Sequence, residues 1–234
     1  MEFLLDDQKT EKHFQDILRQ LVPLQNGVVA HSMKERGILY KVNLGASIVD
    51  LRKLAKYYTP DHLLALKLWN KGWRETKILA TLLEVPEELS EEQMDYWVRS
   101  FESTELAEQA VLNLFPRNKF AYVKALEWCR GKKFLVKYTG LLLMGRLAFT
   151  DHKAPDEMFE PFFDVLPPLT KDSKLSEVFY RTFGQLGRRS IELNKTAIEF
   201  AHFMKTLESE AASLLADQIL EELQSDWVQA KLKS

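Results

Sequence analysis

Apolar residues recur along the chain at the spacing i, i+3, i+4 and i+7, which places them on one face of an α-helix. The alternation of apolar and polar residues that is typical of strands is not sustained anywhere. Capping boxes at Ser47-Ile-Val-Asp50 and Ser90-Glu-Glu-Gln93 mark two helix starts. Pro60 and Pro155 mark two more, because proline is favoured in a first turn. The pattern therefore predicts an all-α protein.

The segments that carry the helical spacing cover most of the chain. They run over residues 7–21, 27–36, 48–57, 60–71, 74–83, 91–101, 105–115, 118–129, 133–149, 155–165, 173–187, 191–204 and 208–231. Their connections are short, so successive helices are expected to lie antiparallel as neighbours. We predict an α-α superhelix, or solenoid, of about 12–13 helices in antiparallel pairs. An irregular helical globule is the alternative, because ordinary helix hairpins and degenerate repeats look alike in sequence.

The chain has no linker rich in Gly, Ser and Pro, which favours a single domain over residues 1–234. Within it we expect N-terminal helices at 1–40, core repeats at 41–206 and a C-terminal helix at 207–234. The 234 residues, 46% of them apolar, can bury a sizeable core without disulfides or metals.

Composition also indicates the cellular compartment in which the protein is expected. Cys129 is the single cysteine, so no disulfide framework and no cysteine-based zinc cluster can form. The N-terminal segment carries acids where a signal peptide would carry bases. The longest nearly apolar stretch, residues 138–149, contains Arg146 and is shorter than the roughly 20 residues of a membrane span. We expect a cytoplasmic protein that does not enter a membrane.

Common catalytic motifs are absent from the sequence. It contains no Gly-rich phosphate loop, HExxH, CxxC or GxSxG element, and its five histidines are scattered singly. Large aromatic residues are expected to serve the core. Trp97 has this role in particular, because it lies at helical spacing from Met94 and Phe101.

The net charge of −2 hides a segregation of charge into blocks. Residues 41–78 hold eight Lys or Arg and three acids, whereas residues 84–108 hold nine acids and one Arg. Residues 132–205 are mildly basic, and residues 208–226 hold six acids and no base. Such blocks fit solvated helix faces, and a basic block also suits a nucleic-acid contact.

From Gly45 onward the sequence contains recognisable motifs in addition to its helical periodicity. It reads GASIVDLRKLAKYY, then LALKLWNKGWRETKILATLL, then LSEEQMDYWVRSFESTELAEQAVLNLF. These segments resemble the bacterial DNA alkylation repair family of HEAT-like repeat glycosylases, the AlkD type. The family elements LW, E, LA and D-x-W occur in order at fitting distances. The resemblance covers residues 34–203.

The resemblance implies a C-shaped solenoid of HEAT-like pairs whose concave, basic face binds duplex DNA. It also implies excision of cationic N3- or N7-alkylated purines without a metal or other cofactor. An alkylpurine is already a good leaving group, so the protein mainly has to stabilise the positive charge that develops on the sugar. A carboxylate near the sugar can do this.

Four family positions are changed in this chain. The catalytic Asp of the family falls at Glu108 and its Arg at Lys137, so both charges keep their sign. Two family tryptophans fall at Thr104 and Gln185, which removes both aromatic rings. Glu108 is therefore the candidate catalytic residue and Lys137 its candidate support, although lysine lacks the bidentate fork of arginine.

Contacts to the DNA backbone are expected from cations on and around two predicted helices. Such contacts attract DNA without reading its sequence. The candidates are Lys132, Lys133, Lys137, Arg146, Arg188 and Arg189.

Three functions remain open on the sequence. The first is an active alkylpurine DNA glycosylase, and the second is a relative that binds double-stranded DNA but has weakened or lost excision. The third is a non-catalytic scaffold that binds a protein partner on an extended helical surface. The loss of both rings favours the second.

Overall fold

The computed structural model describes residues 7–233, which form fifteen α-helices joined by short loops and 3₁₀ turns. No strand occurs in this range, and only Val42 and Trp73 form an isolated bridge. The chain divides into two compact units, residues 1–118 and 119–234. The all-α prediction is confirmed, whereas a single domain over 1–234 stays a prediction. Residues 1–6 of the expected N-terminal helices, and residue 234 of the expected C-terminal helix, lie outside the described residues.

None of the helices between residues 7 and 233 combines the length and the apolar character needed to span a bilayer.

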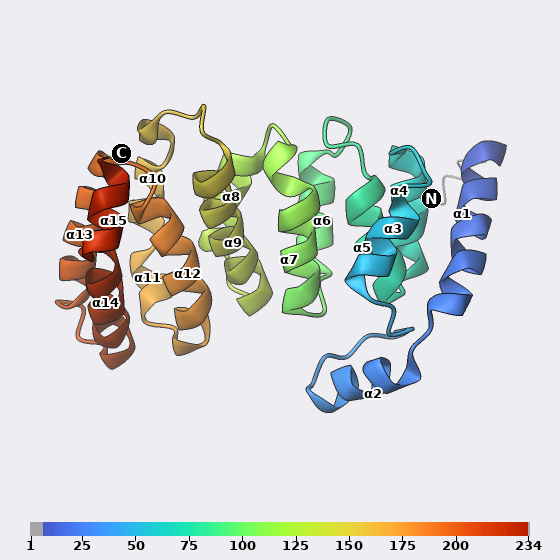
Figure 1. The fold of residues 1–234 in the computed structure, drawn as a ribbon, viewed down its shortest axis with the longest axis horizontal. Coiled ribbons are helices and arrows are strands. Elements are labelled where there is room, and N and C mark those ends of the chain that lie inside the picture. Colours follow the sequence, from blue (N-terminus) through green and yellow to red (C-terminus); the bar gives the residue numbers. More distant parts are fainter. Residues whose placement is uncertain (1–6, 234) are drawn as a thin grey trace. The chain divides into compact units, whose positions relative to one another are not determined.

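The N-terminal unit contains seven α-helices (Figure 1). They are α1 (Gln8–Leu21), α2 (Gly27–Glu35), α3 (Ile48–Ala55), α4 (His62–Lys71), α5 (Arg74–Leu83), α6 (Glu91–Arg99) and α7 (Thr104–Asn113). Most of them begin after a side chain that accepts a hydrogen bond from a first-turn N–H group. These N-caps are Asp7, Asn26, Ser47, Asp61, Ser90 and Ser103. They fix the helix starts because first-turn N–H groups have no partner within the helix.

Helix α5 is the centre of this unit, where it packs against α3, α4 and α7. Trp69 of α4 and Trp97 of α6 stack face to face with ring centroids 4.0 Å apart. Trp97 is 1% exposed, so its predicted core role is confirmed. Helix α2, by contrast, buries only Met33 and is drawn apart from the other helices of the unit (Figure 1).

The C-terminal unit contains eight α-helices. They are α8 (Ala121–Cys129), α9 (Phe134–Thr150), α10 (Glu160–Val165), α11 (Pro167–Thr170), α12 (Ser176–Gly187), α13 (Ile191–Met204), α14 (Glu210–Leu223) and α15 (Asp226–Leu232). Helix α9 is central and packs against α8 and α12. Two glycines of α9 permit the close approach. A Cβ atom at Gly140 would lie 2.6 Å from the backbone nitrogen of Cys129, and one at Gly145 would lie 2.6 Å from Cβ of Thr182.

The structure differs from the predicted helices in three places. The helix expected from Pro155 begins instead as a 3₁₀ turn at Asp156–Met158, and α10 starts only at Glu160. The short helix α11 was not predicted, because a single turn is too short to show a periodicity. The segment 208–231 is two helices, because the side chain of Ser225 accepts a hydrogen bond from Val228 N–H and starts α15.

Candidate nucleic-acid interface

Glu108, the candidate catalytic carboxylate, lies half-buried near the middle of α7. Thr104 is the first residue of this helix and is exposed. Residues four apart share a helix face, so Thr104, Glu108 and Leu112 form one stripe along α7. Leu112 is 43% exposed. The stripe therefore carries one half-buried carboxylate, but it contains no aromatic ring that could stack against a sugar.

A second carboxylate of the family-like sequence, Glu75, is fully buried near the start of α5. It accepts hydrogen bonds from the backbone N–H groups of Leu44, at 3.1 Å, and Ala46, at 3.3 Å. The guanidinium group of Arg74 also donates to it, at 2.9 Å. Glu75 thus ties the loop before α3 to α5. Glu75, the glutamate of the family-like motif, therefore has a structural role and is not a candidate catalytic residue.

Arg74 connects this carboxylate to α7. Its Nε and Nη2 atoms donate to both oxygens of Glu105, at 2.8 and 2.6 Å. The hydroxyl of Tyr40 donates to Glu105 at 2.9 Å, and burial together with the charge of Glu105 raises the pKa of that phenol. Sequence reasoning missed this network. The sequence did hold a sign of it, because Arg74 and Glu75 stand within a helical pattern of apolar residues. Charged side chains that are buried there require charged or hydrogen-bonding partners.

Two exposed lysines, Lys132 and Lys133, directly precede α9 in the C-terminal unit. Lys133 occupies the N-cap position, and no side chain caps the first turn of this 17-residue helix. The N-terminus of a helix carries partial positive charge and free N–H groups, which together favour anions. Two ammonium groups and the positive end of α9 are therefore placed together.

Lys137 and Arg146 lie further along α9, and both are half-buried. The Nζ atom of Lys137 donates to Asp172 at 2.6 Å, and this hydrogen bond lowers the pKa of the Asp172 carboxyl. Arg146 lies 5.8 Å from the ring centroid of Phe149, which is 54% exposed. Lys137 lies one turn from the two lysines that precede α9, whereas Arg146 is about 14 Å further along the helix axis.

The remaining predicted residues lie on or after α12. Arg188 forms an ion pair with Glu222 of α14. Arg189 donates to the carbonyl oxygens of Ala148 and Ala154, and its side chain is 8% exposed. Both guanidinium groups therefore hold α12 to neighbouring segments. Gln185 is half-buried on α12.

The structure thus divides the predicted residues between the two units. Glu108 and Thr104 belong to the N-terminal unit, and the remaining predicted residues belong to the C-terminal unit. Among these, Lys132, Lys133 and Lys137 are brought together at one end of α9.

Comparison with known proteins gives both a family and a fold. The family described as DNA alkylation repair enzyme matches residues 17–174, so Gln185, Arg188 and Arg189 lie beyond the matched part. A similar solved structure is described as a new family of proteins related to the HEAT-like repeat DNA glycosylases with affinity for branched DNA structures. It is 14% identical, with a TM-score of 0.70, over 88% of this chain and 93% of that chain. No curated protein matches the sequence.

The structural likeness confirms the predicted solenoid of HEAT-like helix pairs. The family match covers more than half of the 234 residues and includes the LW, E, LA and D-x-W elements. Its residues shape the core of the N-terminal unit, as the Trp69–Trp97 stack and the buried Glu75 show. The chain belongs to the DNA alkylation repair enzyme family.

Proposed function

We propose that this protein binds DNA through its phosphate backbone and has weak or no alkylpurine excision. The proposal rests on two observations: the start of α9 carries exposed lysines, and positions where the family has aromatic residues have lost them. Lys132 and Lys133 lie exposed at the uncapped N-terminus of α9. Thr104 and Gln185 stand where the family resemblance implies tryptophans.

The cationic helix start supports DNA binding on physical grounds. A phosphate at the N-terminus of α9 would meet first-turn N–H groups as well as two flexible ammonium groups. Lys137, although paired with Asp172, adds a third cation one turn away. Such contacts release counterions from DNA and carry no sequence information. Affinity for branched DNA in the similar solved structure supports branched as well as duplex DNA as a ligand.

Weak excision is expected because the α7 stripe lacks an aromatic ring. A carboxylate at Glu108 could still stabilise positive charge on a deoxyribose. Without a ring at Thr104, however, the stripe has no side chain that stacks against the sugar to hold it in place. Orientation contributes a large part of catalytic acceleration, so a carboxylate alone is expected to release bases slowly.

Fluorescence anisotropy with a labelled duplex and a labelled four-way junction tests the DNA contact. In the Lys132→Ala/Lys133→Ala variant, we expect the slope of log K against log salt to become shallower by about 2. The matched control, Lys195→Ala/Lys205→Ala, removes two exposed lysines of the same unit and should leave the slope unchanged. Equal effects of the two pairs would contradict a specific contact at α9.

Release of 7-methylguanine and 3-methyladenine from alkylated DNA tests the catalytic part. We expect a rate close to spontaneous depurination, with no further loss in Glu108→Gln. Rapid release that is abolished in this variant would instead establish an active glycosylase with Glu108 as its catalytic residue. Absence of DNA binding even at low ionic strength would reject the nucleic-acid function and favour the protein scaffold.

A further inference from the structure

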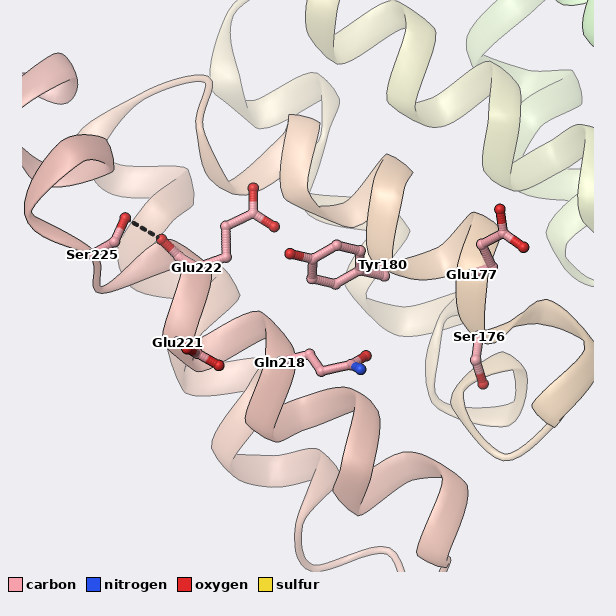
Figure 2. A pocket seen from close by; sticks show the side chains of 7 residues that line it. All are labelled: Ser176, Glu177, Tyr180, Gln218, Glu221, Glu222 and Ser225. Atoms are coloured by element: carbon pink, nitrogen blue, oxygen red, sulfur yellow. Dashed lines mark hydrogen bonds between the residues drawn. The ribbon is translucent and has the colours of Figure 1, made fainter.

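A groove runs between α12 and α14 in the C-terminal unit, far from α9's lysines in sequence (Figure 2). One hollow of about 740 Å³ and a second of about 380 Å³ share Ser176 and Gln218, so they form one continuous groove. We call it the α12–α14 groove. Its walls include Glu177 and Tyr180 on α12 and Glu210, Leu214, Gln218 and Glu221 on α14.

The wall on α14 is one face of that helix. Leu214, Gln218 and Glu221 follow one another at helical spacing, which exposes a continuous stripe over about two turns. Leu214 is 60% exposed although it is a large aliphatic residue. Tyr180 projects from α12 toward Glu222 of α14 (Figure 2). The groove therefore offers an exposed aliphatic side chain on α14 and a half-buried aromatic ring on α12, and exposed apolar surface in a groove is typical of a docking surface.

One end of the groove is closed by contacts between the two helices. Gly187 packs directly against Leu223, since a Cβ atom at this glycine would lie 2.6 Å from Cδ1 of Leu223. Arg188 pairs with Glu222, and a hydrogen bond from Tyr180 to Glu222 raises the pKa of the tyrosine. These contacts fix the width of the groove in the folded protein.

The charge of the groove has one sign. Its lining holds four glutamates and no Lys, Arg or His. Glu222 is paired with Arg188, whereas Glu177, Glu210 and Glu221 are exposed. The whole segment 208–226 holds six acids and no base. An anionic ligand such as DNA would be repelled here, whereas a cationic ligand would be attracted.

We propose that the α12–α14 groove binds a lysine- or arginine-rich amphipathic segment of a partner protein. The apolar side of such a segment would cover Leu214 and Tyr180, and its cations would meet Glu177, Glu210 and Glu221. An amphipathic helix laid into an apolar groove is a recurrent mode of peptide recognition. Complementary charge on the rim gives selectivity for basic over acidic partners. The groove shares no lining residue with the proposed DNA contact at Lys132 and Lys133, so each proposal can fail without the other.

A fluorescent reporter in the groove provides the test. Ser176→Cys places a thiol in the lining, where a dye can be attached through iodoacetamide. The native Cys129 does not compete, because it is buried and burial raises the pKa of its thiol to about 12. The probe is a synthetic peptide of lysine and leucine at amphipathic helical spacing. Its two controls are the same composition in scrambled order and a glutamate–leucine peptide of the original pattern.

The proposal predicts a saturable change of the reporter with the lysine–leucine peptide and a weaker one with the scrambled peptide. Glu177→Lys/Glu221→Lys should weaken binding at least about tenfold, and this variant should gain binding of the glutamate–leucine peptide. The matched control Glu192→Lys/Glu199→Lys reverses two exposed acids on α13, outside the groove, and should change affinity less than about twofold. Circular dichroism checks that all variants remain folded.

Three results would overturn the proposal. The first is the absence of a reporter change with the lysine–leucine peptide. The second is equal weakening in the groove and control variants, which would indicate attraction to overall charge. The third is the same reporter change on adding duplex DNA alone, which would make the groove a nucleic-acid contact.

Discussion

Replacement of Glu75 by alanine should strongly destabilise the N-terminal unit. The carboxylate is fully buried and accepts hydrogen bonds from Leu44 N–H, Ala46 N–H and the Arg74 guanidinium. The variant leaves two backbone donors without their acceptor and removes one of the two carboxylates that neutralise Arg74. The remaining carboxylate, Glu105, stays bound through two hydrogen bonds.

The magnitude follows from these contacts. A buried donor left without an acceptor costs about 1–3 kcal/mol, and breaking a buried ion pair costs about 3–5 kcal/mol. Because Arg74 retains Glu105 and the carbonyl of Ala46, the full cost of an orphaned charge does not apply. We expect Glu75→Ala to lower the free energy of unfolding by about 3–5 kcal/mol. Glu75→Gln should lose roughly half as much, because its amide oxygen still accepts one N–H group.

Urea unfolding followed by tryptophan fluorescence measures this loss. Trp69, Trp73 and Trp97 lie in the N-terminal unit and Trp128 and Trp227 in the C-terminal unit, so fluorescence and far-ultraviolet circular dichroism both report the two units. The control Glu199→Ala removes an exposed carboxylate of α13 and should change stability by less than about 0.5 kcal/mol. A loss below about 1 kcal/mol in Glu75→Ala would refute the structural role of the motif glutamate.

Two further predictions concern the C-terminal unit. Gly145→Ala should lower stability by about 1–3 kcal/mol in urea unfolding, because the new Cβ atom would lie 2.8 Å from the backbone Cα of Thr182. An unchanged urea midpoint would contradict the close approach of α9 and α12. The hydrogen bond from Lys137 lowers the folded-state pKa of Asp172, so its stabilisation is full above the unfolded pKa of about 4 and is lost as pH falls through the lower folded value. Lys137→Met should therefore remove up to about 1 kcal/mol at pH 6 and less at pH 2, and a loss that is equal at both values would refute the assignment.

Local sequence signals predicted most of the helix starts. Ser47 and Ser90 cap α3 and α6 as the capping boxes indicate. Pro60 was a weaker signal, because the cap is Asp61 and α4 begins at His62. The break before α15 could not be found from periodicity, because Ser225 stops one helix and caps the next without a Gly or Pro to mark it.

Tertiary pairing was harder to predict than secondary structure. The Arg74–Glu105 pair joins residues 31 positions apart and depends on the packing of α5 against α7. For the same reason, Arg189 has the basic character expected of a phosphate contact, yet its guanidinium is occupied by two backbone carbonyl groups. Sequence shows which residues carry charge, but the fold decides which charges remain available to a ligand.

The predicted DNA-contact residues fall into two groups, those that are exposed and those that are paired with an acid. Lys132 and Lys133 are exposed, Lys137 is paired with Asp172, and Arg188 is paired with Glu222. The two exposed lysines are therefore the most informative positions to change, and the paired cations are expected to affect stability as well as binding.

The central claim is DNA binding through the phosphate backbone. The measurement that tests it most directly is the affinity of the unmodified protein for a labelled duplex over a series of salt concentrations. The proposed contact predicts that log K falls linearly with log salt, with a slope of about −0.9 for each phosphate contacted. No binding at the lowest salt concentration, or an affinity that does not change with salt, would contradict it.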